Sequence, residues 1–262
     1  MDNLGLVSIV TPTYNCEEFI SETIKSVLVQ TYPYWELLVV DDCSKDNTVA
    51  IVKEWCAKDE RIKLFVQQQN GGASLARNKA ILESTGKYIA FLDGDDLWLP
   101  EKLEKQIKFM HDNNILFSYH DTYTYIQGER FSIEEMHPSR YYPKSVSYSD
   151  MLKWDMVGCL SVVFDASVIG KITIPRIDKR NDYGLFLKIF KIQKGLIGHL
   201  YDEKLAIYRR RPASISNVSK WKLVKYHYQM FHEVLEFNSL LSVVLTIRNM
   251  VYYKYYMKFN RN

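Results

Sequence analysis

Short apolar runs alternate with amphipathic segments along the N-terminal part of the chain. Residues 6–10, 36–40, 62–66 and 87–92 form the apolar runs, which predict buried strands. Between them the apolar residues recur at helical spacing, as in residues 19–28. Strands that alternate with helices in this way predict an α/β fold with a mostly parallel central sheet flanked by helices.

The helix over residues 19–28 is expected to begin at a capping box, because Asn15 is followed three positions later by Glu18. Beyond residue 120 the periodicity is weaker. We still expect a helix from about Asp182 and a strand over residues 200–211.

The last part of the chain, residues 220–262, has the pattern of two amphipathic helices. It contains five Lys, two Arg and six Tyr against Glu233 and Glu236, which gives a charge of +5. Because the whole chain carries +3, about −2 remains for residues 1–219. We therefore predict a catalytic domain over residues 1–219 and a basic, aromatic-rich helical extension over residues 220–262.

The composition narrows the functional class. With 262 residues, 47% hydrophobic and 25% charged, the chain can bury a full core, and its small net charge argues against a nucleic-acid partner. The four cysteines form no C-x-x-C pair, and neither a signal-peptide pattern nor an apolar run of about eighteen residues is present. These features favour a cytoplasmic protein with reduced thiols.

Three polar clusters each follow a predicted strand: TPTYN at 11–15, DDCSKDNT at 41–48 and DGDD at 93–96. In a doubly wound sheet, ligands bind beyond the carboxyl ends of the strands, so the clusters should meet in one crevice. Each cluster taken alone is more often an ordinary turn or helix-capping loop. Their joint position is what favours a functional site.

The DGDD cluster suits a hard divalent cation, because Mg²⁺ and Mn²⁺ prefer carboxylate oxygens and also bind ligand phosphates. The chain has no P-loop and no G-x-G-x-x-G after the first strand. We therefore expect loop groups to help hold phosphates, with Arg77 as one candidate and the backbone at Gly71 and Gly72 as another.

These motifs also carry a resemblance. The stretches VSIVTPTYN through DDCSKDNT, NGGASLARNKAI and YIAFLDGDDLWLPEKLEKQ resemble the inverting glycosyltransferases of family 2, which have the GT-A fold. The similarity is dense over residues 6–106 and recurs over residues 180–216. Among bacterial relatives, it is greatest to enzymes that build O-antigen, capsule or teichuronic acid.

The resemblance implies roles for individual residues. Pro12, Tyr14 and Asn15 match the family's nucleotide pocket, and Asp42 matches the residue that binds uracil. Asp93 and Asp95 match the outer positions of the D-x-D motif, with Asp95 as metal ligand and Asp93 near the ribose or a metal-bound water; Asp96 is then structural. Three residues match the late loop that closes over the diphosphate: Arg209, Arg211 and Ser214.

The same resemblance places the catalytic base at Asp182. Relatives usually carry a Glu-Asp pair there, whereas this chain has Asn181-Asp182, which leaves the orientation of the base open. An alternative for Asp182 is a helix N-terminal charge that interacts with the helix dipole. A carboxylate ionised at neutral pH can take the proton of an attacking hydroxyl.

The leading hypothesis is a metal-dependent, inverting transferase that moves a hexose or N-acetylhexosamine from a UDP-sugar to a saccharide or lipid-linked acceptor, with Mn²⁺ or Mg²⁺ as cofactor. A sugar nucleotidyltransferase and a non-catalytic carbohydrate- or membrane-binding scaffold are the alternatives. For residues 220–262 two hypotheses stand side by side: peripheral contact with the inner face of the plasma membrane, or packing on the domain or in a homodimer.

Overall fold

The computed structural model describes residues 2–138, 142–211 and 220–259. One continuous sheet forms its centre, in the strand order β3-β2-β1-β4-β9-β6-β10-β5, with β7 paired to β6 and β8 to β10. The strands are β1 (Val7–Thr13), β2 (Trp35–Asp41), β3 (Ile62–Val66), β4 (Tyr88–Phe91), β5 (Leu97–Trp98), β6 (Phe117–Ile126), β7 (His137–Pro138), β8 (Ser145–Val146), β9 (Val163–Asp165) and β10 (Gly198–Arg210).

The long strands of this sheet run in one direction. Strands β3, β2, β1 and β4 are parallel neighbours, and β10 is parallel to β6. Only the short β9 lies between the two groups, antiparallel to both β4 and β6. Because two successive reversals restore the direction, β6 and β10 run the same way as β1. The predicted mostly parallel α/β sheet is confirmed, with antiparallel strands β5, β7, β8 and β9 added to it.

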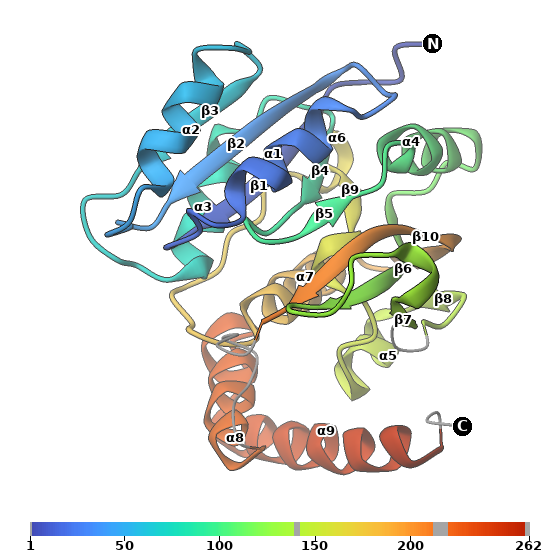
Figure 1. Ribbon diagram of the computed structural model, residues 1–262. Coiled ribbons are helices and arrows are strands. Elements are labelled where there is room, and N and C mark those ends of the chain that lie inside the picture. The colour runs from blue at the N-terminus through green and yellow to red at the C-terminus, as the bar shows by residue number, and fades with distance from the viewer. Residues whose placement is uncertain (1, 139–141, 212–219, 260–262) are drawn as a thin grey trace.

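Helices cover both faces of the sheet (Figure 1). Alternate residues of β2 point to opposite faces: Leu37 and Val39 pack with α1 and α4, whereas Leu38 and Val40 pack with α3 and α7. The described helices are α1 (Ile20–Leu28), α2 (Thr48–Cys56), α3 (Ala73–Glu83), α4 (Lys102–Asp112), α5 (Tyr148–Lys153), α6 (Ala166–Ile169), α7 (Asn181–Ile192), α8 (Lys220–Gln229) and α9 (Ser239–Phe259), with the short turns η1 (Ile133–Glu135), η2 (Cys159–Ser161) and η3 (Met230–Val234).

The expected capping box at Asn15 and Glu18 is wrong. Helix α1 begins at Ile20, its N-cap is Phe19, and no side chain caps it. The Asn15 side-chain oxygen instead accepts a hydrogen bond from the backbone of Lys45 at 2.8 Å. The Asn15 side chain, which the sequence pattern assigned to the start of the helix, thus forms a tertiary contact instead.

The C-terminal helices pack on the rest of the molecule. Met230, Phe231, Val234 and Leu235 are buried in the same apolar core as α7, and Leu245 of α9 joins them. Figure 1 shows α9 lying beneath α5, at the edge of the molecule. The two predicted helices are therefore present. The division of the chain at residues 219 and 220 stays a prediction, since residues 212–219 are outside the described ranges.

No helix in the described part of the chain is both long and apolar enough to cross a membrane.

Candidate active site

The ends of β1, β2 and β4 bring the three polar clusters to one edge of the sheet. Thr13, at the end of β1, is in register with Asp41 at the end of β2, and β1 also pairs with β4. The residues that follow each strand therefore emerge side by side. This convergence was predicted from the order of strands and helices alone.

The turn after β1 is tied to the loop after β2. Asn15 adopts a left-handed backbone conformation with φ of 49°, and its amide donates to the Ser44 hydroxyl at 2.9 Å. Ser44 in turn donates to the Asp41 carboxylate at 2.5 Å. The ring of Tyr14 is left 43% exposed beside this loop, next to Pro12 in the buried end of β1. An exposed aromatic ring on a rigid turn can stack on a planar base.

Asp42 anchors the glycine loop ahead of α3. Its carboxylate accepts hydrogen bonds from the backbone of Gly71 at 2.7 Å and Gly72 at 2.8 Å, and the residue is only 3% exposed. Gly72 has a φ of 82°, which a residue with a side chain adopts only under strain. In this structure Asp42 fixes a loop at the site, while its predicted contact with uracil stays a prediction.

Asp93 and Asp95, the two acids of the D-x-D motif, each face an arginine from another part of the chain. Asp93 is 2.6 Å from the Arg77 guanidinium of α3, and Asp95 is 2.6 Å from that of Arg211 after β10. Gly94 permits this turn, because a Cβ there would lie 2.7 Å from the Thr13 methyl group. The cluster is thus a paired, partly buried site and not a solvated turn.

The electrostatics of the cluster reflect the closeness of its acids. Burial, followed by repulsion from Asp93, raises the pKa of the Asp95 carboxyl, although Arg211 partly offsets this. Burial and the charges of Asp95 and Asp93 raise the pKa of Asp96 well above its usual range. The repulsion among these carboxylates means that a cation bound beside them would be stabilised.

The predicted base lies in the first turn of α7, beside the same cluster. Arg77 donates to the side-chain oxygen of Asn181 through one nitrogen and to Asp93 through the other. Burial alone would lower the pKa of Arg77, but the carboxylates of Asp93 and then Asp182, together with Cys159, raise it. Asp182 is half-buried, and its carboxylate accepts the Tyr183 amide at 2.9 Å. Arg77 therefore links the start of α7 to the DGDD turn.

The carboxylates of the site fit a Mg²⁺ or Mn²⁺ ion that is shared with a bound ligand better than a metal ion held by protein groups alone. Within the described ranges, no group of three or more His, Cys, Asp and Glu side chains could hold a metal ion. Asp93 and Asp95 are two hard oxygen donors at one turn, and Mg²⁺ is commonly held by one or two carboxylates together with ligand phosphates and water. The residues present thus fit a cation that binds together with a nucleotide diphosphate.

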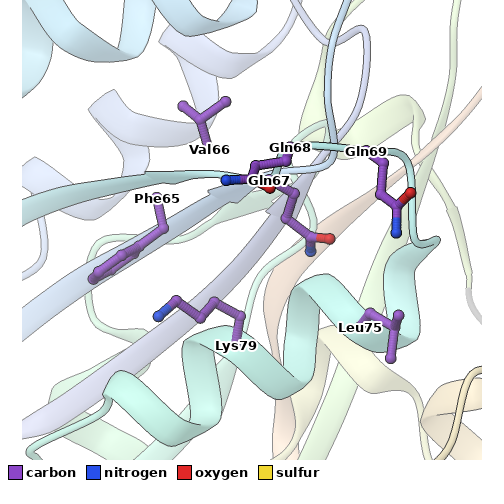
Figure 2. Close-up of a pocket in the computed structure, with 7 residues that line it drawn as sticks. All are labelled: Phe65, Val66, Gln67, Gln68, Gln69, Leu75 and Lys79. Atoms are coloured by element: carbon purple, nitrogen blue, oxygen red, sulfur yellow. The ribbon is translucent and has the colours of Figure 1, made fainter.

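A cavity of about 630 Å³ lies between β3 and α3, away from this cluster (Figure 2). Its walls are Phe65, Val66, Gln67, Gln68, Gln69, Leu75 and Lys79. Figure 2 shows Lys79 below Phe65, and the Lys79 nitrogen lies 5.3 Å from the centre of that ring. None of the predicted site residues lines the cavity and it holds no carboxylate, so it does not fit a divalent cation.

Two arginines after the DGDD cluster in sequence have different surroundings. Arg209 donates through its backbone to Asp96 at 2.8 Å and through its guanidinium to Glu22 of α1 at 2.5 Å, so it holds β10 to the turn. Arg211 instead contacts Asp95 directly. Ser214, the third predicted residue of the late loop, lies outside the described residues.

Sequence patterns missed two of these partners. Asn181 was noted only as a departure from the family's acid, yet it accepts the buried Arg77. Nothing in the sequence distinguishes Glu22 from other acidic residues in the first turn of a helix, where they are common. No local signal connects Glu22 with Arg209, which lies 187 residues later.

The sequence model of glycosyl transferase family 2 matches residues 8–168. The chain belongs to this family. It is 39% identical over 229 residues to a Bacillus subtilis protein named as a teichuronic acid biosynthesis glycosyltransferase, TuaG, covering 87% of this chain and 88% of TuaG. It is also 39% identical over 252 residues to the Escherichia coli glucosyltransferase WfgD, covering 94% of this chain and 92% of WfgD.

Solved structures agree with the fold expected for a family 2 glycosyltransferase. Staphylococcus aureus TarS, in a complex with UDP-GlcNAc, aligns with a TM-score of 0.72 at 20% identity over 98% of this chain and 74% of that one. A Pyrobaculum calidifontis mannosyltransferase aligns with a TM-score of 0.64 at 16% identity, over 97% and 74% of the two chains. The expected GT-A fold is confirmed. The family also decides among the three functional hypotheses in favour of a glycosyltransferase.

Proposed function

We propose that this family 2 enzyme transfers a sugar from a UDP-sugar to a hydroxyl of a lipid-linked saccharide, with inversion and with Mn²⁺ or Mg²⁺ as cofactor, during synthesis of a bacterial surface polysaccharide. The observation that carries the proposal is the cluster of Asp93, Asp95, Arg77 and Arg211 beside Asp182 at one sheet edge. The cluster combines groups that can stabilise an anionic leaving group with a carboxylate that can accept the proton of the attacking hydroxyl.

The nucleotide half of the site is formed by the β1 turn and the glycine loop. Tyr14 offers an exposed ring for the base, Asn15 holds the turn against the next loop, and Pro12 lies in the buried last part of β1. Asp42 keeps Gly71 and Gly72 in place, and we assign its remaining acceptor capacity to uracil.

The leaving group is a nucleoside diphosphate, whose departure leaves negative charge on its outer phosphate. Asp95 and Asp93 would hold the divalent cation, and a bound cation supplies Lewis-acid stabilisation of that charge. Arg211 lies next to Asp95 and is 24% exposed on its side chain, so its guanidinium can reach a diphosphate at the same place. Arg77 is buried and keeps Asp93 in position.

Asp182 takes the proton of the acceptor hydroxyl. The bond from Arg77 to the neighbouring Asn181 supports this assignment, because it ties the start of α7 to the DGDD turn. One base opposite the leaving group gives a single displacement and therefore inversion at the sugar carbon.

The relatives indicate the donor and acceptor class. WfgD and WfaP of Escherichia coli are named as enzymes that use UDP-glucose and GlcNAc-diphosphoundecaprenol. The TarS complex contains UDP-GlcNAc. We carry the UDP-sugar and the lipid-linked acceptor over to this chain on that basis, without choosing the sugar or linkage.

Calorimetry with UDP, with and without Mn²⁺, tests the donor and the cofactor. We expect UDP to bind at least about 10-fold more tightly when Mn²⁺ is present, because the cation joins the carboxylates to the phosphates. GDP serves as the control and should bind more weakly. Equal UDP affinity in the presence of Mn²⁺ and of a chelator would contradict the proposed cofactor.

The variant Asp182→Asn tests the base. A positioned general base contributes about 10²- to 10⁴-fold, so turnover should fall by that factor while UDP affinity stays unchanged. Asp202→Asn, an exposed acid in β10, is the matched control and should keep full turnover. Wild-type turnover in the Asp182 variant would remove this residue from the mechanism.

A further inference from the structure

Helix α9 exposes a row of aliphatic side chains to solvent. Leu240, Val244, Ile247 and Val251 are 77%, 52%, 59% and 64% exposed, and Val243 beside them is also exposed. Their spacing of four, three and four residues puts them in one row along the helix. We call these four residues the outer row. An exposed contiguous apolar strip of this kind usually marks an interaction surface.

The opposite side of α9 is mostly polar and buried. Ser242, Thr246 and Asn249 face the body of the protein, together with Leu245. Asn249 donates to the Lys153 carbonyl and to the Tyr183 hydroxyl, each at 3.0 Å. These bonds fix the rotation of the helix, so the outer row cannot turn inward without leaving buried polar groups unpaired.

The charged residues in the sequences of α8 and α9 favour one class of partner for this surface. The helix contains Arg248, Lys254 and Lys258 and no acidic residue, and α8 adds three further lysines with no acid. Apolar side chains combined with basic and aromatic ones on a helix favour the interface of an anionic lipid bilayer.

A second copy of the chain fits this surface less well. Two outer rows brought together would also bring two basic helices together, and α9 offers no acid to compensate them. The outer row, from Leu240 to Val251, spans about 17 Å of helix at 1.5 Å per residue and forms a narrow strip. A stable interface needs about 800 Å² on each partner.

From these observations we infer that the outer row of α9 seats the protein in the interface of an anionic lipid membrane. The proposal does not depend on the reaction assigned above. It also has a geometric consequence. Asn249 donates a hydrogen bond to the hydroxyl of Tyr183, the residue next to the proposed base Asp182, so the membrane-facing helix α9 is connected to the helix that carries that base.

Flotation with vesicles tests this inference on the full chain. The wild type should float with vesicles of equal parts phosphatidylglycerol and phosphatidylcholine, and much less with phosphatidylcholine alone. Replacing the outer row with serine (L240S/V244S/I247S/V251S) should lower partitioning by about 10-fold or more, because the apolar contact is lost. The matched control replaces four aliphatic residues outside α9, each more than half exposed, with serine and should float like the wild type: Val29, Leu82, Val168 and Ile192.

Two further measurements on the same variants separate the outcomes. Calorimetry with UDP should give the same affinity for the wild type and the outer-row variant, which also shows that the variant is folded. Light scattering in solution should give a mass close to the monomer's 30.9 kDa for both. A wild type that fails to float, an outer-row variant that floats equally well, or a dimer that the serine substitutions dissociate would each overturn the inference.

Discussion

Asp95 and Asp96 are adjacent in sequence, but their side chains have different partners. The Asp95 carboxylate faces Arg211 at the edge of the site, whereas the Asp96 carboxylate is buried and accepts the backbone amide of Arg209. A pattern of three acids in four positions does not distinguish these environments. In the structure Asp96 is enclosed and bonded to the backbone of β10, whereas Asp95 keeps 17% of its side chain exposed.

Substitutions at the two positions should therefore separate binding from stability. In Asp95→Asn we expect the Mn²⁺-dependent gain in UDP affinity to disappear and the free energy of unfolding to stay within about 1 kcal/mol of the wild type. In Asp96→Ala the Arg209 amide loses its acceptor, which costs about 1–3 kcal/mol. Calorimetry and urea unfolding measure the two effects. A stable Asp96→Ala protein without UDP binding would contradict this assignment.

At the scale of elements, the turn after β4 depends on how closely it approaches β1. Gly94 lies where any side chain would meet the buried Thr13 methyl group. The turn can therefore present Asp93 and Asp95 on either side of a residue without a Cβ.

We expect Gly94→Ala to lower the free energy of unfolding by about 1–3 kcal/mol, because the added methyl group overpacks the contact. It should also weaken UDP binding, since the turn must move. Gly170→Ala, with a φ of 83° and open space around it, is a control that adds strain away from the site. If both variants lose stability but neither loses UDP affinity, the close approach does not position the site.

Helix α8 contributes a buried histidine to the packing below α7. Burial, with a smaller effect of Arg180, lowers the pKa of His227 to about 3. Its ring lies edge-on to Trp154 with centroids 6.1 Å apart, and among the described residues neither ring nitrogen has a hydrogen-bond partner.

The unfolded chain, with a histidine pKa of about 6.5, therefore binds a proton that the folded protein does not between pH 6.5 and pH 3. The contribution of His227 to the free energy of unfolding is fully present above pH 6.5. Below that pH the free energy of unfolding falls by about 1.4 kcal/mol per pH unit. Urea unfolding of the wild type and His227→Phe at pH 7 and pH 5 should show a smaller pH dependence in the variant. The exposed His137→Gln is the control. Identical pH dependence in all three proteins would refute the shift.

At the scale of the whole molecule, the C-terminal extension is part of the core. Four side chains of η3 and the residue after it are buried against α7, the helix that carries the proposed base: Met230, Phe231, Val234 and Leu235. The sequence pattern allowed both a separable tail and a packed one. The structure shows packing on one side of α9 and exposure on the other.

Removal of residues 220–262 should therefore unfold the protein. Exposing four buried apolar side chains costs about 6–12 kcal/mol in total, which is comparable to the stability of a whole domain. Circular dichroism and size-exclusion chromatography of a 1–219 fragment should show aggregation or loss of cooperative unfolding. A fragment that melts like the full chain and binds UDP would show instead that the extension is dispensable.

The sequence alone predicted the strands and helices of the N-terminal part of the chain, the edge of the sheet at which its polar clusters meet, and the carboxylates proposed to act there. Apolar periodicity depends on which faces are buried, and residues after neighbouring parallel strands must emerge together. Motif resemblance then supplied the family and roles for residues from Pro12 to Asp182. All of this information is contained in short stretches of chain.

Only the tertiary structure decided which charges meet. The pairs of Arg77 with Asn181 and Arg211 with Asp95 join residues more than 100 positions apart. The Asn15 side chain also bonds the backbone of Lys45, 30 positions later, and does not cap α1. The exposed outer row of α9 is likewise set by the bonds of Asn249. Such contacts form only when helices and strands pack against one another. A local sequence pattern therefore does not show which side chains come within bonding distance, or which of several possible partners a side chain takes.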